Sequence, residues 1–392
     1  MEKFKRNFLS FIGNYKIIFA VYVIICVITA VNNYYRGPQS YNNYLLFKYV
    51  YVHTVEQKNI FLQYPDLFFD SNHYGVFFSA LIAPFALLQD GLGMVAWNIA
   101  NTLVFLFAIY KTPFSDQKKS FFAWLCLQEF ITASLYYQFN IALTGLLILS
   151  AVYIYERKEV QSVTAILIGV FVKIYGIVGL TQFFFIKNKT KFILSGLVIA
   201  GLFFVIPMIY SSPEFVTQCY ADWFHSLIEK NSENQVLGNM QDISLMGVVR
   251  RILGDPSISN LVFLAFGLPL FALPYVRIKQ YQHYAFQLMI LASSLLFLVL
   301  FSSSSESPTY IIAVTGVMIW YFLQKEKTPF VIGLLIFVII FTCFSTSDLF
   351  PKFVKKNYII KYSLKAVPCI VVWLRVCYEL LSKDFEKNYS FK

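Results

Sequence analysis

The stretch Gln63-Tyr-Pro-Asp-Leu-Phe-Phe-Asp-Ser-Asn-His-Tyr-Gly75 gathers side chains that can accept or donate a proton. It contains two carboxylates, Asp66 and Asp70, followed closely by the imidazole of His73. A carboxylate beside a histidine and several tyrosines can serve as a general base next to a platform that binds a sugar. Asp70 and Asn72 could equally cap the helix that follows, so the residues alone leave a catalytic and a structural interpretation open.

Three basic residues could hold an anionic group. Lys173 interrupts a long apolar run, where a charge is costly unless it has a function or a partner, and it could there meet an anionic lipid headgroup. Arg250 and Arg251 belong to a segment that we predict to be a helix at the membrane interface, where they could clamp a phosphate or act as anchors. Glu129 and Lys173 are the clearest charges inside apolar runs, and Glu129 either has a function or pairs with another polar group.

Motifs for bound cofactors are missing from the sequence. There is no P-loop, no dinucleotide-binding glycine motif and no zinc-protease signature. His53 and His225 do not have the spacing of metal ligands, and the six cysteines form no Cys-x-x-Cys pair or disulfide framework. We therefore expect neither a cofactor nor a metal.

The composition indicates which elements must position these residues. The chain is 58% apolar and only 14% charged, whereas a soluble domain has about 25% charged residues. The apolar residues form runs of about 17–25 residues, long enough to span a hydrocarbon core as helices. These runs do not alternate apolar and polar residues, so a membrane β-barrel is not expected. The sequence predicts an all-α polytopic protein in which residues 1–392 form a single membrane domain.

The net charge of +11 does not indicate a nucleic-acid partner. The lysines and arginines lie in short clusters between apolar runs, which is typical of loop ends that face anionic lipid in the cytoplasm. The expected partners therefore include membrane lipids and no nucleic acid.

The positions of these basic clusters predict a topology. The apolar runs lie at 17–34, 74–89, 93–110, 120–136, 139–155, 161–186, 192–210, 259–275, 284–302, 308–323, 329–345 and 364–381. Most basic clusters face the cytoplasm if 74–89 is a short helix dipping into the outer leaflet and 161–186 is a broken hairpin. The prediction is about ten crossings plus two half-length elements, with both termini cytoplasmic and Lys3, Lys5 and Arg6 inside.

Two polar stretches, 35–73 and 211–258, then become the first and second extracytoplasmic loops. The loop 346–363, with its several lysines, fits poorly on the same side. Half-length elements at membrane depth are tolerated when they line a wet cavity or are buried in protein. We therefore expect a cavity that opens toward the outer face and is roofed by the two long loops.

An ordered set of short motifs resembles glycosyltransferase family 87, the polyprenol-phosphate-mannose-dependent alpha-1,2-mannosyltransferases with a C-type membrane glycosyltransferase fold. The resemblance covers roughly residues 17–350. It rests on Tyr41-Asn-Asn-Tyr44, Tyr64-Pro-Asp with Asp70 and His73-Tyr-Gly, Trp97-Asn98 with Asn101, Gln138-Phe-Asn140, Lys173-Ile-Tyr-Gly, Gln241-Asp-Ile-Ser with Arg250-Arg251, and Ser305-Glu-Ser-Pro-Thr309. Each motif is short, so their order and their positions on outward-facing turns are what indicates the family.

The resemblance implies an inverting transfer of one sugar, with mannose as the family's sugar, from a polyprenyl-phosphate donor to a hydroxyl of a lipid or glycan acceptor. It also implies an aspartate in the first external loop as general base, and cations, here Lys173 and Arg250 or Arg251, on the departing phosphate. The sugar and the acceptor would be bound by polar residues of the same segments: Asn42, Asn43, His73, Tyr74, Gln138, Asn140, Gln241, Asp242 and Glu306. With the short loops, the resemblance suggests a bacterial cytoplasmic (inner) membrane.

This chain departs from the family pattern at the expected base. Members have an acidic residue just after the first span, where this sequence has Asn42 and Asn43, and an amide cannot accept the proton. Either Asp66 or Asp70 replaces it, or the activity is changed or lost. We favour Asp70, which lies nearest to His73. The Lys-x-Pro pattern of the hairpin also differs, since Lys173 is followed by Ile-Tyr-Gly.

Two other classes compete with a glycosyltransferase. A transporter or flippase of lipid-linked sugars would show repeated halves and carboxylates within its spans, but this sequence has no visible repeat and few charges within spans. A protein like an O-antigen ligase or polymerase would also transfer a sugar externally, from a different donor.

Overall fold

The computed structural model describes residues 13–234, 236–237 and 240–390, and these residues form helices and connecting segments without a β-strand. This confirms the predicted all-α polytopic fold. The basic residues Lys3, Lys5 and Arg6, which we predict to be cytoplasmic, lie outside the described residues. The chain divides into two compact units, Met1–Lys111 with Ile131–Lys230, and Thr112–Phe130 with Asn231–Lys392.

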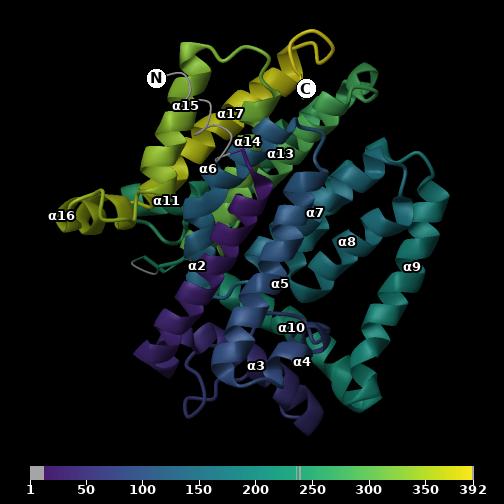
Figure 1. Ribbon diagram of the computed structural model, residues 1–392, viewed down its shortest axis with the longest axis vertical. Helices are drawn as coiled ribbons and strands as arrows, with labels where there is room; N and C mark the ends of the chain where they lie inside the picture. The colour runs from purple at the N-terminus through teal and green to yellow at the C-terminus, as the bar shows by residue number, and fades with distance from the viewer. Residues whose placement is uncertain (1–12, 235, 238–239, 391–392) are drawn as a thin grey trace. The chain divides into compact units, whose positions relative to one another are not determined.

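The first unit is an assembly of packed helices. They are α2 (Tyr15–Arg36), α3 (Asn42–Glu56), α4 (Phe78–Ala86), α5 (Asp90–Lys111), α7 (Asn140–Tyr155), α8 (Glu159–Val172) and α9 (Lys189–Val205), with the last residues of α6 (Asp116–Leu135) and most of α10 (Pro213–Asn234). Helix α7 lies between α5 and α8 and packs against both (Figure 1). Gly145 on α7 permits a close approach to α5, because a Cβ there would lie only 2.8 Å from the Val104 carbonyl oxygen.

The structure confirms that the run 161–186 is broken. Helix α8 ends at Val172, Lys173 has extended backbone (φ −140°, ψ 121°), and a 3₁₀ segment, Ile174–Phe185, follows and packs back against α8. Gly169 and Gly176 face each other in this hairpin, since a Cβ on Gly169 would lie 3.0 Å from the Cα of Gly176. The run 74–89 is likewise confirmed as a short helix, because α4 has only nine residues.

The second unit contains α11 (Leu245–Leu253), α12 (Asn260–Ala272), α13 (Tyr284–Leu300), α14 (Tyr310–Leu323), α15 (Pro329–Val338), α16 (Lys352–Val354) and α17 (Val367–Ser382), together with the first residues of α6. Its core is a group in which α13, α14 and α17 contact one another. A π-helical turn, Ile339–Cys343, extends α15, and a second, Lys355–Ile360, follows α16.

Three of the described helices are long and apolar enough to cross a membrane: Tyr15–Arg36, Asp90–Lys111 and Lys189–Ile209. Seven shorter apolar helices have 10–17 residues: Asn140–Tyr155, Glu159–Val172, Ile174–Phe185, Asn260–Val276, Tyr284–Leu300, Ser307–Leu323 and Pro329–Cys343. Their bounds follow the predicted apolar runs closely. The number of crossings and their orientation stay predictions.

The two predicted polar loops contain helices. Helix α3 lies in 35–73, and α10, with 22 residues, occupies much of 211–258. The predicted interfacial helix is α11, where the Ser244 hydroxyl accepts the Gly247 N–H at 3.0 Å and Gly254 ends the helix with φ 71°. The residues Ser212-Pro213-Glu214 indicate the start of α10, because serine often caps helices and proline is favoured at the first helical position.

Candidate functional site

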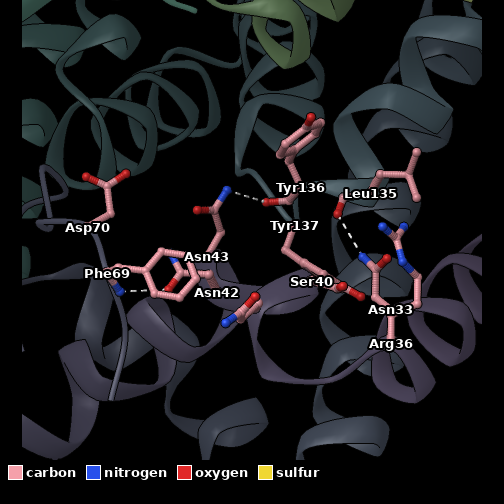
Figure 2. Close-up of a pocket in the computed structure, with 11 residues that line it drawn as sticks. Asn33, Arg36, Ser40, Asn42, Asn43, Phe69, Asp70, Leu135, Tyr136 and Tyr137 are labelled. Carbon is pink, nitrogen blue, oxygen red and sulfur yellow. Dashed lines mark hydrogen bonds between the residues drawn. The ribbon is translucent and has the colours of Figure 1, made fainter. Parts of the chain in front are cut away.

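Asp70 lies at a pocket of about 610 Å³ in the first unit (Figure 2). The pocket is lined by the end of α2, the start of α3, the loop before α4 and the turn between α6 and α7: Asn33, Arg36, Gln39, Ser40, Asn42, Asn43, Phe69, Asp70, Leu135, Tyr136 and Tyr137. About half of the Asp70 side chain (47%) is exposed. Asp66 is exposed on the same loop but does not line this pocket.

The two asparagines that replace the expected acid also line the pocket. Asn42 Oδ1 accepts the backbone N–H of Phe69 at 2.9 Å, and Asn43 Nδ2 donates to the Tyr136 carbonyl at 3.0 Å. Each amide therefore fixes one wall of the pocket with one of its polar atoms. The other atom, Asn42 Nδ2 or Asn43 Oδ1, is left for a ligand.

One hydrogen bond and one longer ionic contact orient the Asp70 carboxylate. Its Oδ1 accepts the Ser71 N–H at 2.8 Å and lies 3.9 Å from Lys230 Nζ, on α10. The contact with Lys230 is a long one that leaves the carboxylate uncovered. Asp70 is therefore oriented and still accessible.

His73 joins the loop that contains Asp70 to α10. Its Nδ1 lies 2.7 Å from the Ser226 hydroxyl and its Nε2 lies 3.2 Å from the Ser71 hydroxyl. Ser226 donates its only hydroxyl proton to the Asn72 carbonyl at 3.2 Å, so His73 Nδ1–H must be the donor to Ser226. Trp223 adds a hydrogen bond from its Nε1 to the His73 carbonyl at 2.8 Å.

Burial, followed by the positive charges of Lys230 and Lys173, lowers the pKa of His73 to about 3. The imidazole is therefore neutral at physiological pH. It fits the role of a residue that positions the loop better than that of an acid or base that titrates near pH 7.

A second cluster of polar residues in the same unit is centred on Lys173. Its Nζ donates to Asn140 Oδ1 at 3.0 Å and lies 4.7 Å from the ring centre of Tyr175 and 5.8 Å from that of Tyr74. Asn140 in turn donates to Gln138 Oε1 at 2.5 Å. The fold thus brings together residues that are far apart in the sequence. Lys173 is not among the residues that line the pocket at Asp70.

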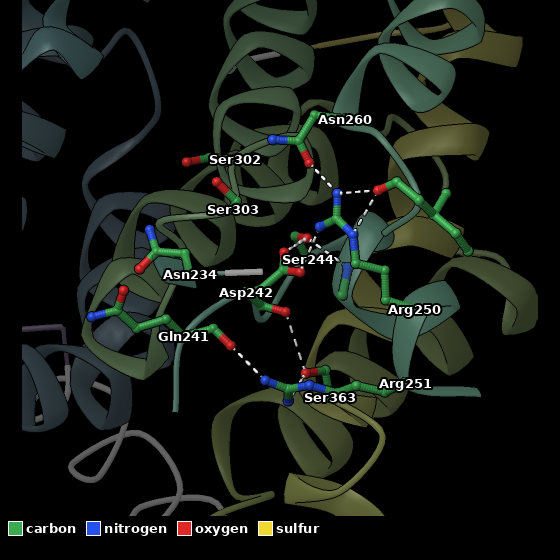
Figure 3. Close-up of polar contacts among 12 residues, drawn as sticks. Asn234, Gln241, Asp242, Ser244, Arg250, Arg251, Asn260, Ser302, Ser303 and Ser363 are labelled. Carbon is green, nitrogen blue, oxygen red and sulfur yellow. Dashed lines mark hydrogen bonds and ion pairs between the residues drawn. The ribbon is translucent and has the colours of Figure 1, made fainter. Parts of the chain in front are cut away.

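Arg250 is buried in the second unit and satisfied by protein groups (Figure 3). Its guanidinium forms an ion pair with Asp242 at 2.8 Å, donates to the Ile258 carbonyl at 2.7 and 2.9 Å, and contacts Asn260 Oδ1. Asp242 also accepts the Ser244 hydroxyl at 2.6 Å. This network fixes the segment that leads into α11.

Arg251 contacts the same segment at the neighbouring residue, Gln241 (Figure 3). It donates to the carbonyls of Gln241 and Ile360 at 2.6 and 3.0 Å and contacts the Ser363 hydroxyl. Burial lowers the pKa of this guanidinium below its ordinary value. Glu306 caps the short 3₁₀ turn Ser307–Thr309 in the same unit.

Glu129, also in the second unit, pairs with another polar group. Lys365 Nζ lies 2.9 and 3.1 Å from its two carboxylate oxygens and donates to the Ser307 hydroxyl at 2.9 Å. Both members of the pair are buried. Of the two interpretations of Glu129, pairing is the one that the structure supports.

The predicted site residues fall into two sets. The first unit contains Asp66, Asp70, Lys173, Asn42, Asn43, His73, Tyr74, Gln138 and Asn140, and the second contains Arg250, Arg251, Gln241, Asp242 and Glu306. Sequence reasoning assigned no role to four further residues of the first unit: Arg36, Trp223, Ser226 and Lys230. Three of these lie on α10, which the sequence predicted to be part of a loop.

Comparisons with known proteins add a family. The family model of glycosyltransferase family 87 matches residues 72–303, more than half of the chain. No curated protein matches the sequence. Among solved structures, "ArnT from Cupriavidus metallidurans bound to Undecaprenyl phosphate" is similar at 11% identity and a TM-score of 0.46, over 93% of this chain and 76% of that chain. The family match includes Lys173 and begins after Asp70, so a role for Asp70 depends on the pocket geometry.

Proposed function

This chain belongs to glycosyltransferase family 87, and from that membership we propose that it transfers a hexose from a polyprenyl-phosphate donor to a hydroxyl of a lipid or glycan acceptor. Mannose is the first candidate for the sugar. The proposed location is the extracytoplasmic face of a bacterial cytoplasmic (inner) membrane, with both termini in the cytoplasm.

The observation that supports a catalytic site most directly is the position of Asp70 in a polar pocket. Its carboxylate is accessible, its loop is fixed by the contacts of His73, and two asparagine amides line the same pocket. An accessible, oriented carboxylate beside neutral hydrogen-bonding groups is what a general base for a sugar acceptor needs. Asp66 lies outside the pocket and is the weaker candidate.

The proposed reaction is one in-line displacement. The acceptor hydroxyl oxygen bonds to the anomeric carbon of the donor sugar while the bond from that carbon to the phosphate oxygen breaks. The polyprenyl phosphate leaves with the electron pair of the broken bond, and Asp70 takes the proton of the hydroxyl. A single displacement inverts the anomeric configuration through an oxocarbenium-like transition state, as in inverting glycoside chemistry.

Cations would stabilise the charge that develops on the departing phosphate. Of the three proposed from the sequence, we favour Lys173, whose ammonium group lies near Asn140 and two tyrosine rings. Arg250 and Arg251 direct their donors at protein acceptors, so phosphate binding by either would compete with those bonds.

The residues that we propose to bind the sugar and the acceptor are likewise divided between the two units. Asn42 Nδ2 and Asn43 Oδ1 would bind hydroxyl groups in the pocket, and Tyr74, Gln138 and Asn140 lie around Lys173. The proposed contributions of Gln241, Asp242 and Glu306 come from the second unit, where Asp242 is paired with Arg250.

An assay with the purified full chain in proteoliposomes tests this function. Radiolabelled polyprenyl-phosphate mannose is supplied with an extract of lipid and glycan acceptors, and both the glycosidic product and the transbilayer movement of the donor are measured. We expect a new glycosidic product that depends on the protein, with the configuration opposite to that of the donor. Donor movement without any product would favour the flippase alternative, and transfer from a diphosphate-linked donor alone would favour the ligase or polymerase alternative.

A further inference from the structure

We propose that Arg36 binds the phosphate of the donor inside the pocket that also contains Asp70. This inference depends on the proposed function, because it identifies the group in the active site that holds the phosphate of a lipid-linked sugar. Neither the sequence motifs nor the family match, which begins at residue 72, assigns Arg36 a role.

The charges of the pocket are few and opposite. Among the described residues that line it, Arg36 and Asp70 are the only charged ones. Figure 2 shows them on different sides, with the side chains of Ser40, Asn42 and Asn43 between them. A pocket with one cation, one carboxylate and neutral hydrogen-bonding groups between them matches a ligand that has a phosphate at one end and hydroxyl groups at the other.

The Arg36 side chain is available for a ligand. It is exposed, and no described residue forms a hydrogen bond or an ion pair with it. Several other arginines are engaged, since Arg250 pairs with Asp242 and Arg277 donates to two backbone carbonyls. An arginine that lines a polar pocket and has no partner among the described residues is suited to an anionic ligand.

The backbone at the end of α2 places Arg36 at the pocket. The helix ends there because Gly37 has φ 92°, a left-handed value that a residue with a Cβ rarely adopts. The short 3₁₀ segment Pro38–Tyr41 follows and leads directly into α3, which begins at Asn42. This tight turn brings Arg36, Ser40 and Asn42 to one pocket.

The chemistry of the proposed reaction requires this separation of charges. A guanidinium remains protonated and can donate two parallel hydrogen bonds to phosphate oxygens, so it can stabilise the leaving group throughout the reaction. The base must act on the attacking hydroxyl, at the opposite side of the anomeric carbon from the leaving group. Arg36 would thus hold the phosphate while Asp70 receives the proton, and Lys173 would add a second positive charge from the same unit.

A binding experiment on the full chain in nanodiscs of neutral lipid tests Arg36. The probes are undecaprenyl phosphate, undecaprenol, inorganic phosphate and phosphatidylglycerol, added to wild type, to Arg36→Gln and to the matched control Arg157→Gln. Arg157 is also an exposed arginine of the first unit, and it lies in the turn between α7 and α8, away from the pocket residues.

We expect wild type and Arg157→Gln to bind undecaprenyl phosphate in preference to undecaprenol. Arg36→Gln should bind it about ten- to a hundredfold more weakly, the usual effect of losing hydrogen bonds to a charged group. Arg36→Lys should recover part of the affinity. Equal binding by Arg36→Gln and wild type would overturn the inference, as would a wild type that binds undecaprenol as well as it binds undecaprenyl phosphate. If phosphatidylglycerol or inorganic phosphate by itself displaces undecaprenyl phosphate, and this displacement requires Arg36, the pocket is a general anion site. That result would also overturn the inference.

These outcomes are separate from the test of the proposed function. A wild type that transfers sugar while Arg36→Gln keeps full affinity would refute the role of Arg36 and leave the function intact. A protein with no transfer but with Arg36-dependent binding of the lipid phosphate would refute the transfer reaction and support the phosphate site.

Discussion

His73 Nδ1 lies 2.7 Å from the Ser226 hydroxyl, and this contact joins the loop that contains Asp70 to helix α10. Ser226 donates onward to the Asn72 carbonyl, so His73 donates from Nδ1, and the neutral imidazole can accept the Ser71 hydroxyl at Nε2. A second proton on His73 would remove the acceptor that Ser71 uses. The position of the proposed base therefore depends on the protonation state of a neighbouring histidine.

The pH dependence of stability follows from the lowered pKa of His73. The unfolded chain binds a proton at His73 below about pH 6.5, whereas the folded protein does so only near pH 3, so the unfolded state holds more protons between these values. The stability that comes from neutral His73 is therefore complete above pH 6.5 and is lost as the pH falls toward 3. We expect the unfolding temperature of the purified protein in detergent to fall as the pH is lowered across this range. The free energy of unfolding should decrease by up to a few kcal/mol.

Two variants isolate the contribution of His73 to the pH dependence of the unfolding temperature. His73→Gln should unfold at a lower temperature than wild type at pH 7.5 and should depend less on pH below 6.5. His225→Gln, which changes an exposed histidine of α10, should follow the wild-type curve. A His73→Gln curve parallel to that of wild type would show that His73 does not titrate as described.

Loss of Arg250 should destabilise the second unit. Arg250→Met leaves the buried Asp242 carboxylate without its ion pair, and removal of one partner of a buried pair costs about 3–5 kcal/mol. The double variant Arg250→Met with Asp242→Asn should recover much of this loss. Thermal unfolding of wild type and the two variants checks the expectation. A stable Arg250→Met with selectively weakened donor binding would instead support the phosphate role proposed from the sequence.

The sequence predicted the helical elements better than their contacts. The apolar runs predicted the membrane helices, and the positions of the basic clusters between the runs predicted both interruptions, the break at Lys173 and the short helix α4. Helix α10 was missed because its polar, mixed composition resembles a loop, although its Ser-Pro-Glu start indicated a helix.

Contacts between distant residues could not be derived in the same way. Lys173 was expected near a lipid headgroup, but its bond to Asn140 depends on how α8 packs against α7. Glu129 and Lys365 are 236 positions apart, and no local pattern links them. Arg36 and Asp70 line one pocket because the turn at Gly37 and the loop before α4 converge, which depends on tertiary packing.

Replacement of Lys173 distinguishes a role in phosphate binding from local support. Lys173→Met should raise the KM for the lipid-linked donor by about tenfold or more if the ammonium group contacts the phosphate, because a charged hydrogen bond is lost. Lys187→Met, at an exposed lysine of the same unit, provides the matched control. An unchanged donor KM with a lower unfolding temperature would assign Lys173 to the support of Asn140 and Tyr74 alone.

The most direct measurement is the rate of sugar transfer by Asp70→Asn compared with Asp66→Asn and wild type, each with polyprenyl-phosphate mannose and the same acceptor. The asparagine keeps the size of the side chain and cannot take the proton, so Asp70→Asn should lower kcat by about a hundredfold or more. Its donor KM and unfolding temperature should stay near those of wild type, and Asp66→Asn should remain active. Wild-type turnover by Asp70→Asn would contradict the assignment of the base and, with it, the pocket at Asp70 as the site of transfer.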